Sequence, residues 1–312
     1  MFSGENGLRE VNEAMAAMKV GTVAIVGCPN VGKSTLLNTI LKEKIAIVSD
    51  KPQTTRTRIL GVYHGGEAEI VFLDTPGLHQ PQHQLNKRMV RTALETMQEA
   101  DLLYVMIEGT RPSPGAADRM AIQRVRDVVA KGRQPAFLLI NKVDIVHKAK
   151  LLPLIDSARH MFDWTEIVPV SAKTGFNVDR LLQVTVAQMP EGQAQYDDDV
   201  LTDQTMRTLA AEIIREKVLN ETREEIPYAV AVDIDQFLEE GKLARISASV
   251  LVEKDSQKAI VIGKHGERLK TIGSRARIEM ERLFDMKVFL ELWVKVRAGW
   301  REDDHMLSAL GY

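Results

Sequence analysis

Short apolar runs alternate with stretches of helical spacing over the first two thirds of the chain. Strands are predicted at 22–26, 59–63, 69–73, 102–107, 136–140 and 166–170. Helices are predicted between them at 35–42, 85–99, 116–131, 151–161 and 178–188. This alternation is typical of an α/β domain around a mainly parallel sheet. Because the turn at 64–66 joins two successive strands, we expect one antiparallel edge.

The pattern changes after Pro190. Proline, glycine and the acidic run Asp197–Asp199 interrupt the alternation and indicate a linker. Beyond it we predict a helix at 203–220, strands at 228–237 and 243–252, helices at 256–262 and 267–284, and a strand at 287–296. This α-β-β-α-α-β order predicts a smaller α+β domain, a three-stranded sheet covered on one face by helices.

These patterns divide the chain into four parts. We assign residues 1–19 to an N-terminal extension with a short helical stretch at 13–18, 20–190 to the first domain, 191–202 to the linker and 203–312 to the second domain. The 312 residues carry a net charge of −2, so any basic surface must be local. The single cysteine excludes an intrachain disulfide. Without a signal peptide or a run of ~18 apolar residues, a cytoplasmic protein is expected.

The segment Gly27-Cys28-Pro29-Asn30-Val31-Gly32-Lys33-Ser34 matches the phosphate-binding pattern G-x-x-x-x-G-K-[ST] between a predicted strand and a predicted helix. A glycine-rich turn at a helix N-terminus points backbone N–H groups at phosphate. Lys33 can reach the β- and γ-phosphates, and the Ser34 hydroxyl can bind Mg²⁺. The phosphate contacts expected from this loop are Asn30, Val31, Gly32, Lys33, Ser34 and Thr35.

A second polar cluster follows the strand at 69–73. Asp74 can hold Mg²⁺ directly or through water, and Gly77 can offer its N–H to the γ-phosphate. Leu78 stands where Ras-like enzymes have a glutamine that orients the attacking water. Because leucine cannot make that hydrogen bond, we expect slow hydrolysis by the isolated protein.

Two later strands end in residues suited to guanine. Asp144 can accept hydrogen bonds from the N1–H and N2–H₂ groups of guanine. Adenine lacks this donor pair, so the site would reject ATP. A backbone amide after the strand at 166–170 can meet the guanine O6 atom. The expected guanine contacts are Asn141, Lys142, Asp144, Ser171, Ala172 and Lys173.

Five motifs occur in the order and strand positions of the translation-factor-related GTPases. They are the P-loop, Thr54-Thr55, Asp74-Thr75-Pro76-Gly77, Asn141-Lys142-Val143-Asp144 and Ser171-Ala172-Lys173. The first domain therefore resembles this family, with its P-loop GTPase fold. The resemblance implies that Thr55, rather than Thr54, joins the Mg²⁺ shell when GTP is bound.

The same resemblance assigns roles around the γ-phosphate. It implies catalytic roles for Lys33, Thr55 and Gly77, and metal contacts from Ser34, Thr55 and Asp74. Leu78 matches the subset of GTPases with a hydrophobic residue in place of the catalytic glutamine. Asn30 matches the members of that subset in which a potassium ion can take the position of an arginine finger.

The second domain contains a G-x-x-G loop, Gly263–Gly266, between two predicted helices. Such a loop lets an RNA backbone approach bare N–H groups, and Lys264 adds a cation. Over 254–301, 12 Lys and Arg residues outnumber 6 Asp and Glu residues. The expected RNA contacts are Ile262, Gly263, Lys264, His265, Gly266, Lys270 and Arg275. We expect Trp293 and Trp300 to be packing residues.

This element order resembles the type II KH domain of bacterial ribosome-associated proteins. Together, the two domains resemble the Era family of bacterial ribosome-assembly GTPases from about Lys19 onward. The resemblance implies a monomeric switch that hydrolyses GTP to GDP with Mg²⁺, binds 16S rRNA near its 3′ end and acts in 30S subunit assembly. It also implies peripheral contact with the cytoplasmic face of the inner membrane, which no residue pattern shows.

Two alternatives remain open. The chain can be a signalling GTPase whose KH-like domain docks a protein instead of RNA. It can also be an RNA-binding scaffold with vestigial nucleotide chemistry, although the intact Lys33, Ser34, Asp74 and Asp144 speak against that.

Overall fold

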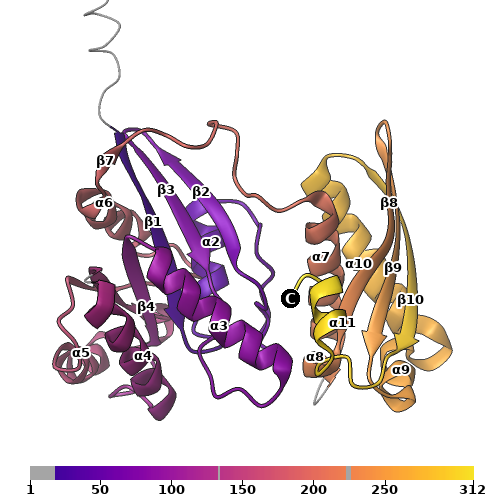
Figure 1. The fold of residues 1–312 in the computed structure, drawn as a ribbon, viewed down its shortest axis with the longest axis horizontal. Helices are drawn as coiled ribbons and strands as arrows, with labels where there is room; N and C mark the ends of the chain where they lie inside the picture. The colour runs from indigo at the N-terminus through magenta and orange to yellow at the C-terminus, as the bar shows by residue number, and fades with distance from the viewer. Residues whose placement is uncertain (1–17, 133, 223–225) are drawn as a thin grey trace, which may run out of the picture.

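Two separate β-sheets organise the chain, one in each half (Figure 1). The computed structural model describes residues 18–132, 134–222 and 226–312. Residues 13–17 of the helix predicted at 13–18 lie outside the described residues. Met18 is the first residue of a strand and not part of a helix.

The first sheet has the order β2-β3-β1-β4-β5-β6, and the short strand β7 pairs with β1. Its strands are β1 (Met18–Gly27), β2 (Ile59–Gly65), β3 (Ala68–Asp74), β4 (Leu102–Glu108), β5 (Ala136–Asn141), β6 (Glu166–Pro169) and β7 (Glu191–Gly192). Strand β2 pairs antiparallel with β3, and β7 pairs antiparallel with β1. The other pairs are parallel. This confirms the mixed, mainly parallel sheet and its antiparallel edge.

Helices cover both faces of this sheet because the residues of β1 alternate between two cores. Val23 and Ile25 pack with α2 and α6, whereas Ala24 and Val26 pack with α3 and α4. The helices are α2 (Lys33–Leu41), α3 (Gln84–Glu99), α4 (Ala116–Gly132), α5 (Leu151–Arg159) and α6 (Val178–Gln188). The parallel strands β1, β3 and β5 all end at one edge, where ligands bind in open α/β sheets.

The second sheet has the order β10-β9-β8, with β10 parallel and β8 antiparallel to β9. Its elements are α7 (Met206–Glu221), α8 (Ile226–Ala229), β8 (Ala231–Glu240), β9 (Leu243–Val252), α9 (Asp255–Ile262), α10 (Glu267–Phe284), β10 (Lys287–Val296) and α11 (Asp304–Ala309). Helices α7 and α10 cover the face toward the first domain (Figure 1). This confirms the KH-type architecture and the predicted α-β-β-α-α-β order, apart from the added helices α8 and α11; the helix predicted at 203–220 begins at Met206.

Two short helices were not predicted. The strand expected at 228–237 begins only at Ala231, because α8 precedes it. Pro227 lies in the first turn of α8, where its missing N–H leaves no helical hydrogen bond unmade. Helix α11 begins after Asp303, whose side chain accepts hydrogen bonds from the N–H groups of His305 and Met306.

The segment at 191–202 lies along the antiparallel edge of the first sheet. The buried Glu69 carboxylate accepts hydrogen bonds from the N–H groups of Gln195 (2.8 Å) and Tyr196 (3.1 Å). The Val62 N–H donates to the Leu201 carbonyl at 2.9 Å. The start of α7 is therefore anchored to the first domain. In the described ranges, no helix has the length and apolar content needed to cross a membrane.

Candidate functional site

Close backbone approaches explain the glycines around the P-loop. Asn30 and Gly32 have positive φ values of 62° and 106°. A Cβ atom at Gly32 would lie 2.2 Å from Asn141 Nδ2, and one at Gly77 would lie 2.7 Å from Pro29 N. Any side chain at either glycine would therefore distort the site.

Three side chains from distant segments meet beside the P-loop. Ser34 Oγ lies 2.8 Å from Thr55 Oγ1 and 2.5 Å from Asp74 Oδ2, and Thr55 Oγ1 lies 3.4 Å from the same carboxylate oxygen. The neighbouring Thr54 instead donates to the Lys51 carbonyl at 2.7 Å. The structure thus brings together the three residues assigned to the metal and places Thr55, not Thr54, among them.

The buried charges here fit a divalent cation and a phosphate group. Burial raises the pKa of the Asp74 carboxyl to about 6, against the opposing effect of the Lys33 ammonium. Burial also lowers the pKa of Lys33, whose Nζ donates to the carbonyl of Cys28 at 3.1 Å. Asp74 Oδ1 is buried without a hydrogen-bond partner among the described residues. A cation beside Asp74 would supply the missing partner, and a phosphate would supply the counter-charge for Lys33.

At the base end, Asn141 connects two loops. Its Nδ2 donates to the Val31 carbonyl at 2.7 Å, and its Oδ1 accepts from the Ala172 N–H at 2.9 Å. The Ala172 amide therefore holds Asn141 in place. The Ser171 hydroxyl donates to Asp144 Oδ1 at 2.7 Å and orients that carboxylate.

One cavity of about 590 Å³ connects the phosphate and base ends. Asp144, Lys142 and Lys173 line it, and Asp144 is exposed to it. Sequence reasoning missed its apolar wall, which Val48 (38% exposed) and Ile145 (68% exposed) provide. The only signal was an apolar residue directly after Asp144. An apolar wall beside an acceptor carboxylate suits a flat heterocyclic base.

Leu78 takes no part in the cavity. It is fully buried among Cys28, Ala93 and Met97, and its N–H donates to the Gly27 carbonyl at 3.0 Å. The side chain in the position of the usual glutamine is therefore held in the core.

The G-x-x-G loop adopts the strained conformation that its glycines permit. Gly263, His265 and Gly266 have φ values of 76°, 51° and 78°. A Cβ atom at Gly263 would lie 2.7 Å from Arg268 Cβ, whereas a Cβ atom at Gly266 would meet nothing within 4 Å. Lys264 and His265 are exposed, so the loop can present N–H groups and a cation to an RNA backbone.

The other residues assigned to RNA fall into two groups. Ile262 packs at the end of α9, directly before the loop, and Lys270 is exposed on the first turns of α10. Arg275 instead pairs with Glu221 of α7 and lines the cleft between the domains. The structure does not bring Arg275 together with the loop.

The two tryptophans of the second domain differ. Trp300 is 1% exposed and its Nε1 donates to the Ala229 carbonyl at 3.0 Å, which confirms its packing role. Trp293 is 59% exposed, so the prediction that it packs inside the domain is wrong. Its strand lies at the edge of the sheet, and the side chain points away from the helices that form the core.

Comparisons with known proteins match both halves of the chain. Residues 22–142 match a family described as "50S ribosome-binding GTPase", and residues 225–301 match the KH domain. GTPase Era of Geobacter metallireducens is 51% identical over 294 residues, which cover 94% of this chain and 97% of that protein. This chain belongs to the Era family of GTPases.

Other Era proteins agree in sequence and in structure. GTPase Era of Staphylococcus haemolyticus is 44% identical over 96% of this chain and 98% of its own length. Solved structures include Era in complex with MgGDPNP and nucleotides 1506–1542 of 16S ribosomal RNA, and a variant of Aquifex aeolicus Era bound to GDP·AlF4−. Each is 42% identical with a TM-score of 0.90, and covers 95% of this chain and 99% of the solved one.

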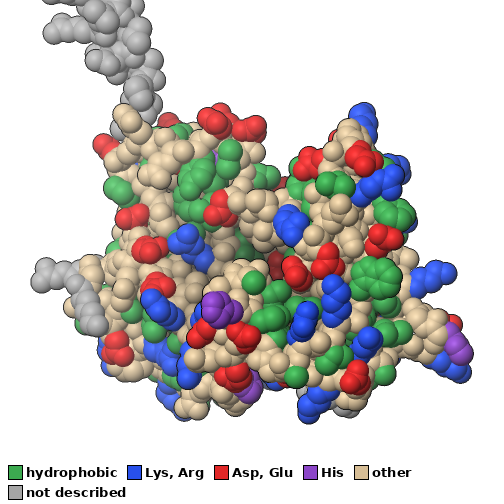
Figure 2. All heavy atoms as spheres, turned by 45° about the vertical axis from the view of Figure 1, so that its right-hand side comes forward, with side chains coloured by type: hydrophobic (Ala, Val, Ile, Leu, Met, Phe, Trp, Pro, Cys, Tyr) green, Lys and Arg blue, Asp and Glu red, His purple; other side chains and the backbone are tan. Residues whose placement is uncertain are grey.

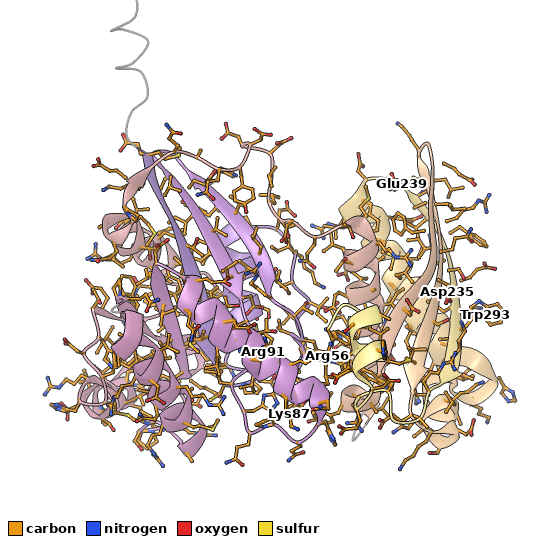
Figure 3. All side chains as sticks on the ribbon, in the orientation of Figure 1. Arg56, Lys87, Arg91, Asp235, Glu239 and Trp293 are labelled. Carbon is orange, nitrogen blue, oxygen red and sulfur yellow. The ribbon has the colours of Figure 1, made fainter. Side chains whose placement is uncertain are left out.

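In this Era-family chain, residues 48–56 of the first domain are called the switch segment. The second domain forms hydrogen bonds to this segment. Arg56 is 4% exposed and donates to the Val230 carbonyl at 2.7 Å and the Tyr312 hydroxyl at 3.2 Å. Its guanidinium also lies over the rings of Trp300 and Tyr312, 5.5 Å and 5.4 Å from their centres. Figure 3 shows Arg56 between the two domains. Thr55 is thus bonded to the nucleotide site of the first domain, and its neighbour Arg56 is bonded to the second domain.

Helix α7 bonds two further residues of the switch segment, Thr54 and Val48. The buried Arg215 donates to the Thr54 carbonyl, and Glu216 Oε1 accepts from the Val48 N–H at 2.9 Å. Burial opposes the low pKa of Glu216, but hydrogen bonds from Lys217 and Lys44 lower it overall. These contacts connect the nucleotide cavity to the domain that carries the G-x-x-G loop.

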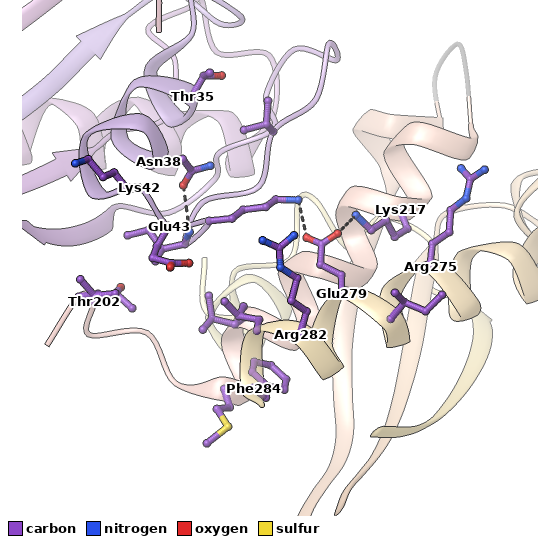
Figure 4. A pocket seen from close by; sticks show the side chains of 18 of the residues that line it. Thr35, Asn38, Lys42, Glu43, Thr202, Lys217, Arg275, Glu279, Arg282 and Phe284 are labelled. Atoms are coloured by element: carbon purple, nitrogen blue, oxygen red, sulfur yellow. Dashed lines mark hydrogen bonds and ion pairs between the residues drawn. The ribbon is translucent and has the colours of Figure 1, made fainter. Parts of the chain in front are cut away.

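Beside these contacts, a cleft of about 1350 Å³ separates the two domains (Figure 4). Glu279 of α10 bridges Lys44 of the first domain, at 2.6 Å, and Lys217 of α7. Thr35 and Val48 line both this cleft and the nucleotide cavity. A movement of the switch segment would therefore change the shape of the cleft.

Proposed function

We propose that this GTPase uses its nucleotide state to control its hold on 16S rRNA near the 3′ end, during assembly of the 30S subunit. The observation that carries the proposal is the bonding of the switch segment to the domain with the G-x-x-G loop. The solved Era complex with nucleotides 1506–1542 of 16S ribosomal RNA supports the choice of RNA. Residues 20–190 would form the GTPase domain and 203–312 the RNA-binding domain.

The geometry of the cavity supports a set of proposed nucleotide contacts. The backbone of the P-loop and Lys33 would hold the phosphates, and Asp144 would read guanine. When bound, Mg²⁺ would offset phosphate charge next to Ser34, Thr55 and Asp74. Gly77, with no side chain, would let its N–H approach the γ-phosphate.

Hydrolysis would then change the contacts between the domains. With GTP bound, Thr55 would stay beside Ser34, and the switch segment would keep the bonds to Arg215 and Glu216 that the structure shows. Once the γ-phosphate left, that segment would lose its ligand contacts and the interdomain bonds would lose their fixed geometry. The RNA groove would then meet RNA in a different arrangement.

Replacing the loop glycines tests RNA binding. Gly266→Asp adds a negative charge where a Cβ atom meets nothing within 4 Å. We expect RNA affinity to fall roughly tenfold or more, since the charge repels the backbone, and GTP affinity to stay unchanged. Gly263→Asp should lose more RNA affinity, because its Cβ atom would also lie only 2.7 Å from Arg268 Cβ and distort the loop. Binding is measured by salt-titrated equilibrium titration with 16S fragment 1506–1542.

The matched control is Gly241→Asp, in the turn between β8 and β9. Gly241 also has a positive φ of 65° and open space around its Cβ position. Undiminished RNA binding by the Gly263 and Gly266 variants would favour the alternative, a KH-like domain that docks a protein.

The proposal includes a potassium ion beside Asn30. This exposed residue lines the nucleotide cavity, and its Nδ2 donates to the Asp50 carbonyl at 2.6 Å. Its Oδ1 can therefore face a cation that offsets charge on the transferred phosphate. Single-turnover GTP hydrolysis should be about tenfold or more faster in potassium than in sodium, and Asn30→Ala should remove the difference. Equal wild-type rates in the two salts would refute this ion site.

The family resemblance extends the proposal to cellular context. We infer a cytoplasmic monomer that contacts the 30S subunit and associates peripherally with the inner membrane. The support for the membrane contact is the resemblance alone.

A further inference from the structure

The outward face of β10 exposes two aromatic side chains. Phe289 is 48% exposed and Trp293 is 59% exposed. They lie four residues apart on one strand, so both point to the same face of the sheet. The other face packs against α7 and α10. Figure 3 shows Trp293 pointing away from these helices.

A cation and a third apolar side chain continue this surface across the sheet. The strand register aligns Leu238 of β8, Arg245 of β9 and Phe289 of β10 in one row. Leu238 is 44% exposed, and the Arg245 guanidinium lies 5.5 Å from the Phe289 ring centre. Figure 2 shows hydrophobic and basic side chains interspersed on this side of the molecule. A flat surface of rings and guanidinium suits another flat, aromatic group.

Charges on this face are unevenly distributed. Outward positions of β10 and the residue just past it carry the cations Lys287, Lys295 and Arg297, with one acid, Glu291. The outward acids of β8 are Asp233, Asp235 and Glu240. Asp235 accepts from Ser249 at 2.5 Å and lies 3.3 Å from Lys295 Nζ, and Glu240 accepts from Arg245 Nε at 2.9 Å. The cations of this face outside these pairs are Lys287 and Arg297, at the two ends of β10. An anionic partner would therefore approach over the ends of β10.

Strand β10 packs against the two helices that flank the G-x-x-G loop. It is the edge strand of its sheet, and both α9 and α10, which flank the loop, contact it. Gly273 of α10 lies against Leu292, with only 3.4 Å between its Cβ position and the leucine side chain. An RNA strand that leaves the loop and passes around this edge of the sheet would reach Phe289 or Trp293.

We propose that the outward face of β10 is a stacking platform for unpaired RNA bases, in addition to the G-x-x-G loop. This inference rests on the proposed RNA binding. Phe289 and Trp293 stack on bases of any sequence, and Glu291 between them accepts a hydrogen bond from an exocyclic amino group. The neighbouring cations contact the RNA backbone.

The test compares two RNAs on the full-length protein. One is a four-nucleotide RNA, about the length that a KH loop clamps, and the other is 16S fragment 1506–1542. We expect Trp293→Ala to weaken binding of the fragment roughly 5- to 100-fold, as for the loss of one stacked base. Binding of the short RNA should not change. Leu152→Ala, at a 68% exposed position on α5, is the matched control.

Tryptophan fluorescence separates stacking from a structural effect. The chain has three tryptophans, and Trp300 is 1% exposed. The fragment should quench the wild-type fluorescence. Trp293→Phe should keep the affinity within about twofold, because a ring still stacks, but lose most of the quenching.

The outcomes distinguish the platform from the proposed function. Unchanged affinity of Trp293→Ala for the fragment, or full quenching in Trp293→Phe, would overturn the platform and leave this face for a protein partner. If the wild-type protein bound neither RNA, the proposed RNA function itself would fail.

Discussion

An Asp144→Asn variant is expected to lose GTP affinity by about 10³-fold or more and to prefer XTP. The carboxylate is positioned by the Ser171 hydroxyl and faces the nucleotide cavity. An asparagine amide would direct a donor at the N–H donors of guanine and leave them unpaired, and a site built for hydrogen bonds rejects such a mismatch by about 10⁴-fold. Xanthine has a carbonyl where guanine has its amino group, so it can accept from the amide.

Competition binding of GTP, XTP and ATP to both proteins measures this change. Asp179→Asn, an exposed aspartate at the start of α6, is the control and should bind like the wild type. A variant at Asp144 that kept wild-type GTP affinity would remove this residue from the base site.

Replacing Arg56 with alanine should uncouple the two domains. The variant loses the bonds to the Val230 carbonyl and the Tyr312 hydroxyl, and the contacts with two aromatic rings. It keeps Thr55, Ser34 and Asp74, so nucleotide affinity should change only a few-fold. The difference in RNA affinity between the GTP-analogue and GDP forms should shrink toward none, because coupling depends on contacts that differ between states.

Arg58→Ala is the control for this experiment. Arg58 lies two residues along, has a side chain that is 40% exposed and pairs with Glu99 of the first domain. RNA titrations of both variants in each nucleotide form measure the coupling. If Arg56→Ala responded to nucleotide like the wild type, the switch segment would not transmit the signal through this residue.

Sequence patterns identified the nucleotide cavity because its chemistry is local. The P-loop, Asp74 and Asp144 each lie at or within a few residues of the end of a strand, and parallel strands bring their ends together. The choice of Thr55 over Thr54 as the Mg²⁺ contact came from the family resemblance alone. The structure supplies a physical basis, because Thr54 turns to the Lys51 carbonyl.

Contacts between distant segments could not be predicted in this way. Arg56 bonds a residue 174 positions away, and no local pattern signals such a partner. Arg275 shares a helix with Lys270, but successive helical positions point in different directions, and Arg275 turns toward α7. For Trp293, the alternation of β10 left open which face was outward, and packing of the helices decided it.

The central claim is that nucleotide state and RNA binding are coupled through the switch segment. The most direct measurement is the affinity of the wild-type protein for 16S fragment 1506–1542, at one salt concentration, with GTP analogue and with GDP. We expect affinities that differ by about 5- to 150-fold, the range of a typical coupling free energy. RNA should change the ratio of GTP-analogue to GDP affinity by the same factor. Equal RNA affinity in the two nucleotide forms would contradict the account.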